Sequence, residues 1–163
     1  EVFTALQTGA LDATEFVSPY NDLAAGYHTV ADYYYYPGWH EPGSTLEAIF
    51  NKERFEALPE DLQAILITGT EMMNQLLLDE LTAKNNEALR VLVEDHGVQL
   101  RRLPDDVLIE LRTISNEVVE EMAQADEATA KVYASWKTFK EGVMNYNSIA
   151  EEAFIEARKL PSN

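Results

Sequence analysis

The chain has 163 residues, 46% of them hydrophobic, which is enough for one domain with a hydrophobic core. Its 29 acidic and 12 basic residues give a formal net charge of −17, which argues against nucleic-acid binding because phosphates require a basic surface. Cysteine is absent, which excludes disulfides, thiolate zinc sites and cysteine nucleophiles, and no apolar run reaches membrane-spanning length. The chain begins at Glu1 without a leader-like segment, so we expect that it is trimmed and that any targeting signal preceded it.

The first 26 residues are predicted to form two short helical segments separated by a strand. Residues 2–8 form a helix that Gly9 ends as a C-terminal cap. Residues 10–17 alternate loosely between apolar and polar types, which predicts a short buried strand. The Ser-Pro pair at 18–19 is a helix-start signal, and the helix or turn that follows ends near Gly26.

Four successive tyrosines dominate residues 31–36 and predict an extended strand, since bulky aromatic side chains fit a pleated surface. The strand must end at the Pro-Gly pair at 37–38, where proline removes a backbone donor and glycine permits a turn. A second Pro-Gly pair follows at 42–43, and another strand is predicted over residues 45–50.

Trp39, His40 and Glu41 lie on the loop between these two Pro-Gly pairs. They combine an apolar wall, a titratable ring and a carboxylate, and loops held by a rigid scaffold are where binding residues concentrate. The alternative is an ordinary turn in which Trp39 is packed while His40 and Glu41 are solvated.

Helix dominates from Asn51 onward. Asn51 is expected to cap a short helix to Leu58, and the Pro-Glu-Asp run at 59–61 starts a second helix that continues to Gly97. Gly69 weakens that helix by up to about 1 kcal/mol without necessarily breaking it. A short strand at 98–101 follows. The apolar residues at helical spacing are Leu62, Ile65, Leu66, Met72, Met73, Leu76, Leu77, Leu81, Leu89 and Leu92.

The last third, from Asp105 to Leu160, lacks proline and contains a single glycine, Gly142. Its apolar residues recur three or four positions apart, as in a helix that lies along another helix. We therefore predict one long helix whose apolar stripe a partner chain or subdomain covers. The alternative is two ordinary helices broken near residues 145–147. The stripe comprises Leu111, Ile114, Val118, Met122, Ala125, Thr129, Val132, Trp136, Phe139, Val143 and Tyr146.

The sequence offers little support for an enzyme. Its three histidines, His28, His40 and His96, form no recognisable nucleophile-and-base pattern, and there is no glycine-rich phosphate loop or His-Glu-x-x-His motif. Glu15 and Glu41 lie near predicted strand ends, and carboxylate and carbonyl oxygens are ligands that sodium or calcium prefers. Either carboxylate could hold a cation that in turn binds an anionic ligand, or both could be solvated surface groups.

Three stretches, at residues 1–15, 33–43 and 51–66, together resemble the C-terminal half of TRAP transporter substrate-binding proteins of the DctP-like type. The branch that it is most similar to binds 2-oxo acids, lactate and similar monocarboxylates as a cation complex. The resemblance implies an α/β fold, the second lobe of a two-lobed periplasmic binding protein, predominantly helical with short strands and a long C-terminal helix.

The resemblance also implies roles for individual residues. Glu41 would be the carboxylate ligand of the cation, and Phe16 would offer its backbone carbonyl to the cation and its ring to the substrate. Glu15, Trp39 and His40 would line the same cleft. Phe16 stands where the branch usually has tryptophan, which removes an indole donor and so affects ligand preference. The arginine that clamps the substrate carboxylate, and a glutamine cation ligand, would lie in the half that is not present.

By the same resemblance, residues 1–103 belong to the ligand-binding lobe and residues 104–163 form a helical segment that mediates homodimerisation. The implied function is non-enzymatic: a periplasmic receptor that binds a small organic acid with sodium or calcium and delivers it to TRAP membrane permease subunits. Two alternatives stay open. One is an acidic helical protein that serves oligomerisation, and the other is a metal-assisted hydrolase with Glu15 or Glu41 as base.

Overall fold

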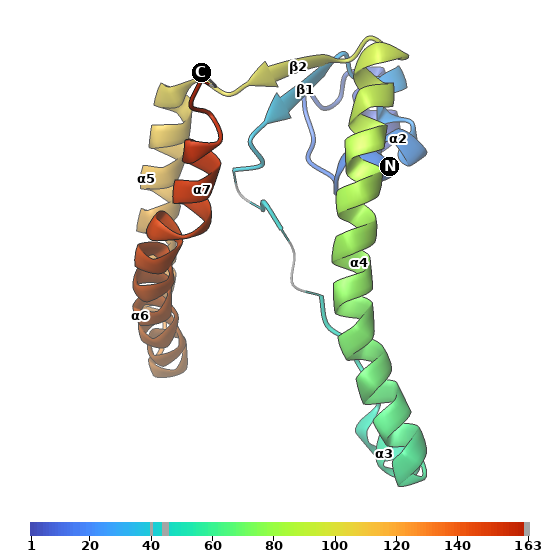
Figure 1. The fold of residues 1–163 in the computed structure, drawn as a ribbon, viewed down its shortest axis with the longest axis vertical. Coiled ribbons are helices and arrows are strands. Elements are labelled where there is room, and N and C mark those ends of the chain that lie inside the picture. The colour runs from blue at the N-terminus through green and yellow to red at the C-terminus, as the bar shows by residue number, and fades with distance from the viewer. Residues whose placement is uncertain (40, 44–45, 162–163) are drawn as a thin grey trace. The chain divides into compact units, whose positions relative to one another are not determined.

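The computed structural model describes residues 1–39, 41–43 and 46–161, and it divides into two compact units, Glu1–Leu103 and Pro104–Asn163 (Figure 1). His40 lies outside the described residues. The elements in chain order are α1 (Val2–Thr8), α2 (Pro19–Ala25), the 3-10 helix η1 (Tyr27–Thr29), β1 (Tyr33–Tyr36), α3 (Lys52–Glu56), α4 (Glu60–Glu94), β2 (Gln99–Arg102), α5 (Asp105–Met122), α6 (Glu127–Ile149) and α7 (Glu151–Ala157).

The two short N-terminal helices begin and end where the sequence predicts. Helix α1 ends at Gly9 and helix α2 at Gly26, both in the left-handed conformation with φ of 73° and 77°. Glycine adopts this conformation without steric penalty, and its N–H then satisfies carbonyls of the last helical turn. Ser18 is the extended N-cap residue of α2, and Pro19 occupies the first turn.

The sheet consists of β1 and β2, which pair in parallel with Tyr33 opposite Gln99 and Tyr36 opposite Arg102. Both strands were predicted, the second one residue earlier than it occurs. The strands predicted at 10–17 and 45–50 are wrong, since residues 10–17 and 46–50 have no strand structure and residue 45 lies outside the described part. A strand requires a neighbouring strand to pair with, and neither segment pairs with one among the described residues.

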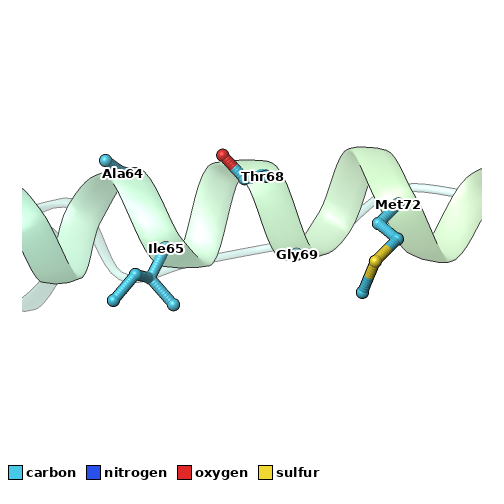
Figure 2. Close-up of a pocket in the computed structure, with 5 residues that line it drawn as sticks. All are labelled: Ala64, Ile65, Thr68, Gly69 and Met72. Atoms are coloured by element: carbon cyan, nitrogen blue, oxygen red, sulfur yellow. The ribbon is translucent and has the colours of Figure 1, made fainter.

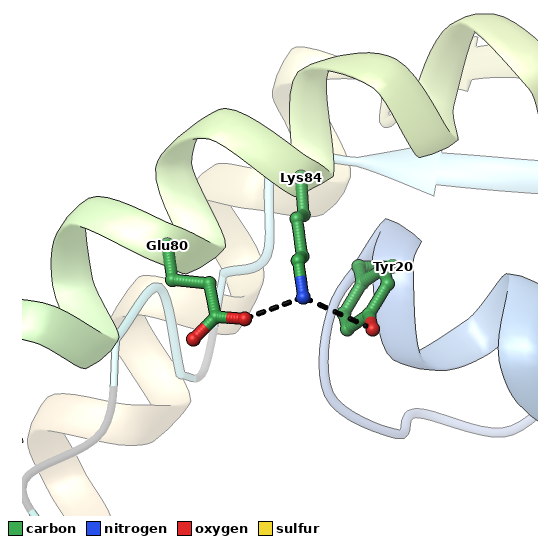
Figure 3. Close-up of polar contacts among 3 residues, drawn as sticks. All are labelled: Tyr20, Glu80 and Lys84. Carbon is green, nitrogen blue, oxygen red and sulfur yellow. Dashed lines mark hydrogen bonds and ion pairs between the residues drawn. The ribbon is translucent and has the colours of Figure 1, made fainter.

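Helix α4 is one continuous helix of 35 residues that runs through Gly69, as predicted. Its C-terminal part packs against α2 and holds the most deeply buried side chains of this unit, with Ala88 4% and Leu92 3% exposed. The backbone N–H of Tyr20 donates to Asn85 Oδ1 at 2.9 Å. Lys84 Nζ reaches both the Tyr20 hydroxyl, at 3.3 Å, and the carboxylate of Glu80 (Figure 3). The core of the first unit therefore lies at this end of α4.

The N-terminal half of α4 is exposed by comparison. Ile65 and Met72 are 64% and 58% exposed, and they point to the same side of the helix with Gly69 between them (Figure 2). The shallow depression at this place is lined by α4 residues alone. An apolar helix surface of this kind is typical of a face that another element covers.

The second unit corrects the prediction of one long helix, because the chain forms α5, α6 and α7 instead. The first break occurs at Asp126, which accepts hydrogen bonds at 2.8 Å from both the backbone N–H and the hydroxyl of Thr129 and so caps α6. The second break, at Ala150, lies a few residues beyond the alternative position at 145–147. At the first break, local side-chain capping therefore overrides the regular apolar spacing.

The apolar stripe of α6 is strongly exposed, with Val132 at 69%, Phe139 at 70% and Tyr146 at 65%. Among the described residues, no helix combines the length and the apolar character that crossing a membrane requires.

Candidate functional site

The Glu15–Phe16 segment lies in the loop that leads into α2. The Phe16 ring meets the Tyr27 ring edge-on, with centroids 5.2 Å apart and planes at 64°. The Phe3 ring also contacts the Tyr27 ring, with centroids 6.2 Å apart. The Thr14 hydroxyl donates to the Glu15 carbonyl at 3.1 Å. These contacts hold the loop against η1 while leaving Phe16 47% exposed and accessible to a ligand.

A buried carboxyl group, Asp22 of α2, joins this loop to the aromatic strand. The Tyr34 hydroxyl donates a hydrogen bond to Asp22 Oδ2. Burial raises the pKa of Asp22, the Tyr34 hydrogen bond and the backbone N–H of Val17 oppose that rise, and the charge of Glu15 adds to it. Burial likewise raises the pKa of Tyr34, with further contributions from Asp22 and Glu15. Glu15, Asp22 and Tyr34 therefore share one electrostatic environment.

Sequence analysis missed Asp22 and Tyr34. Asp22 looks like an ordinary polar residue of a short helix, and Tyr34 is one of four tyrosines. The period of two along a strand is the available signal, because it places Tyr34 on the face opposite Tyr33 and Tyr35. In the structure Tyr34 is half-buried, while Tyr33 and Tyr35 are exposed.

The second predicted loop follows β1. Trp39 is 44% exposed, so it is not the packed core residue that the ordinary-turn interpretation requires, and Glu41 is exposed. The Asp22–Tyr34 hydrogen bond connects α2, which follows the Glu15–Phe16 loop, to β1, which precedes the Trp39–Glu41 loop. Coordination of a shared cation by Phe16 and Glu41 stays a prediction.

The donor types present fit a hard cation. Phe16 would supply a backbone carbonyl and Glu41 a carboxylate, and calcium takes six to eight oxygen ligands of these kinds. The Phe16 carbonyl accepts no hydrogen bond from the described residues, so its lone pairs are available to a cation. No group of three or more His, Asp or Glu side chains with metal-site geometry occurs among residues 1–39, 41–43 and 46–161. The remaining ligands of a complete site would therefore have to come from other groups.

A second ring contact of η1 is a histidine pair. The rings of His28 in η1 and His96, just beyond α4, have centroids 4.0 Å apart with planes at 32°. Burial, and then the neighbouring His96, lower the pKa of His28, whose Nδ1 is buried without a hydrogen-bond partner in the described part of the chain. Sequence analysis assigned no role to His28.

Comparison with known proteins places these features in a family. A monocarboxylate 2-oxoacid-binding periplasmic protein from Nostoc sp. is 36% identical over 154 residues, which cover 94% of this chain and 42% of the relative. A TRAP transporter solute-binding protein from Bordetella bronchiseptica superposes with a TM-score of 0.90 at 29% identity. The superposition covers 96% of this chain and 46% of the Bordetella chain. The Bordetella protein is described as a mixed-occupancy dimer, with calcium and picolinate in one active site and the other site apo.

A TRAP periplasmic solute-binding protein from Colwellia psychrerythraea, with bound calcium and pyruvate, superposes with a TM-score of 0.89 at 32% identity over 96% of this chain and 48% of that protein. The chain thus spans less than half the length of each of these relatives. The model of bacterial extracellular solute-binding proteins, family 7 (DctP), matches residues 1–126. The chain therefore belongs to the DctP family of bacterial extracellular solute-binding proteins.

Proposed function

We propose that the chain is part of the periplasmic substrate-binding component of a TRAP-type transporter. The receptor binds a small monocarboxylate, a 2-oxo acid such as pyruvate, together with calcium, and delivers it to membrane permease subunits without bond chemistry. The observation that carries this proposal is the superposition on a calcium- and pyruvate-bound TRAP receptor at 32% identity. The 36% identity to a 2-oxoacid-binding protein supports the same ligand class.

The net charge explains why a cation belongs in this function. A chain with a formal charge of −17 repels a carboxylate, and a divalent cation reverses the field where the ligand binds. Calcium prefers carboxylate and carbonyl oxygens, which the two candidate loops offer. The bound calcium of two structural relatives favours calcium over sodium.

The candidate residues divide into three roles in this proposal. Glu41 and the Phe16 carbonyl bind the cation, the Phe16 ring and Trp39 contact the organic part of the ligand, and Glu15 and His40 line the cleft. Other parts of the receptor complete the coordination shell and close over the ligand, as two-lobed receptors do.

Charge removal at Glu41 tests the proposal. Glu41→Gln should weaken calcium binding and, with it, pyruvate binding in the receptor that carries this chain, because the amide oxygen is a poorer ligand than a carboxylate. Isothermal titration calorimetry with calcium alone, and with pyruvate at fixed calcium, measures both affinities. Glu47→Gln, which neutralises an exposed carboxylate of the following segment, is the matched control and should bind normally. Equal affinities in the two variants would refute the role of Glu41.

Homodimerisation through the C-terminal helices is the second part of the proposal. The exposed apolar stripe of α6, including Val132 and Phe139, supports it, and so does the dimer described for the Bordetella relative. Phe139→Glu should shift the receptor from dimer to monomer in sedimentation velocity, because it places a charge in the apolar contact. A monomeric unmodified receptor would contradict this part without affecting ligand binding.

A further inference from the structure

Tyr27, the first residue of η1, contacts the aromatic rings of two segments that precede it in the chain. Its ring meets the Phe16 ring edge-on with centroids 5.2 Å apart, and it contacts the Phe3 ring of α1 with centroids 6.2 Å apart. An edge-on contact at this separation is favourable because the positive edge of one ring meets the negative face of the other. The contact therefore favours one orientation of the Phe16 ring over the others.

The segment that carries Tyr27 is itself held on two sides. The carbonyl of Gly26 accepts hydrogen bonds from the backbone N–H of Thr29 at 3.0 Å and from its hydroxyl at 2.7 Å, which close the single turn of η1. Successive side chains of a 3-10 helix point about 120° apart, so Tyr27 and His28 face different neighbours. The His28 ring packs on the ring of His96, just beyond α4. Tyr27 is thus a support that the unit holds in place.

Phe16, in contrast, lies in a stretch without helix or strand, residues 11–17. A side chain in such a loop can take more than one rotamer, and the contact with Tyr27 selects among them. The Phe16 ring nevertheless stays half-exposed, so part of its surface is open to a ligand. A ring that is held in one orientation forms a wall of fixed position, and such a wall limits the length of the ligand side chain that fits against it.

We propose that Tyr27 is a positioning residue that fixes the Phe16 ring and thereby limits the side-chain length of the 2-oxo acid that the receptor accepts. The inference rests on the proposed function, in which the Phe16 ring contacts the organic part of the ligand. Rotation of that ring about its side-chain bonds leaves the backbone carbonyl of Phe16 where it is. Tyr27 therefore acts on ligand preference and leaves calcium binding unchanged.

Removal of the Tyr27 ring tests the proposal in the receptor that carries this chain. The affinities for pyruvate and for 2-oxopentanoate, which is two methylene groups longer, are measured by calorimetry at fixed calcium. Tyr27→Leu should lower the preference for pyruvate over 2-oxopentanoate by about 2- to 10-fold, the range that the energy of one aromatic pair allows. Tyr27→Phe keeps the ring and should keep the preference. Calorimetry with calcium alone should give the same affinity in all three proteins.

A double-mutant cycle separates positioning from general stability. In a receptor that already carries Phe16→Leu, the further change Tyr27→Leu should leave the ligand preference unaltered, because no ring remains to be positioned. Tyr20→Leu is the matched control. It removes a ring of the same unit that contacts Lys84 Nζ, 4.6 Å from the ring centroid, and it should keep the preference for pyruvate.

The outcomes distinguish the inference from the function on which it rests. If Tyr27→Leu does not fold, as judged by circular dichroism, Tyr27→Met takes its place, because the flexible methionine side chain fills the space without a ring. An unchanged ligand preference, or effects that simply add in the cycle, overturns the inference and leaves the proposed function standing. Equal losses of calcium and pyruvate affinity at an unchanged preference overturn it as well. Absence of calcium and pyruvate binding by the unmodified receptor instead overturns the proposed function.

Discussion

Two regions of α4 carry the same kinds of apolar residues in opposite surroundings. Near its C-terminal end Ala88 and Leu92 are buried against the region of α2, whereas Leu78 and Ile65, farther toward the start of the helix, are 62% and 64% exposed. Residue type and helical spacing are alike in the two regions, so the presence of a packing partner makes the difference. Apolar periodicity thus indicates which face will be covered, and says little about what covers it.

The largest test of this comparison truncates one leucine in each region. Leu92→Ala should lower the free energy of unfolding by about 2–5 kcal/mol, because it leaves a cavity in packed surroundings. Leu78→Ala on the same helix should change it by about 0.5 kcal/mol or less in this chain, since the side chain is already in water. Urea denaturation followed by circular dichroism measures both. Similar losses in the two variants would show that the middle of α4 is covered as well.

The polar contacts of the packed end give a second, smaller effect. Tyr34→Phe should destabilise the first unit by about 1–3 kcal/mol, because it removes the donor to a buried carboxyl oxygen of Asp22. Tyr35→Phe, on the exposed face of the same strand, is the control and should leave the denaturation midpoint nearly unchanged. If the two variants unfold at the same urea concentration, the Tyr34 hydrogen bond does not contribute to stability.

The smallest expected effect is a pH dependence at the packed end, where His28 contacts His96. The pKa of His28 in the folded protein lies below its ordinary value of 6.5, so the unfolded chain takes up the proton more readily. The contribution of His28 to the free energy of unfolding is therefore fully present above about pH 6.5, and it is lost as the pH falls through the lowered pKa of the folded state. His28→Gln should flatten the fall in stability on the acid side of pH 6.5, as measured by thermal unfolding at several pH values.

His96→Gln serves as the comparison for this last test. It removes the smaller of the two causes of the lowered pKa of His28 and leaves the burial, so it should flatten the same pH profile less than His28→Gln does. A steeper profile in either variant would contradict the direction of the shift.

Much of the fold follows from local signals in the sequence. Gly9 and Gly26 end helices because the left-handed backbone conformation needed there is accessible to glycine. Asn51 caps α3 by accepting a hydrogen bond from the Arg54 N–H at 3.0 Å. The break at Asp126 was missed because a single capping aspartate competes with an unbroken apolar pattern, and only the relative strength of the two decides. The strand predicted at 10–17 failed because pairing depends on a partner that local sequence does not specify.

The candidate site was predictable only in part. Family resemblance points to Glu15, Phe16, Trp39, His40 and Glu41, and those that the structure describes lie on loops. The Asp22–Tyr34 pair depends on a contact across twelve residues and on burial, which composition and periodicity do not report. Such supporting groups become visible only when the backbone between the loops is in place.

The shape of α4 has a mechanical consequence. Its anchorage on α2 involves Lys84, Asn85 and residues after them, so the 24 residues from Glu60 to the start of that anchorage extend for roughly 36 Å as a stiff rod. A turn of about 10° at the anchored end would carry the free tip through roughly 6 Å, by the same rise per residue. Helix α4 would therefore act as a lever anchored beside α2, so that a small rotation at the anchored end produces a larger displacement of the N-terminal end.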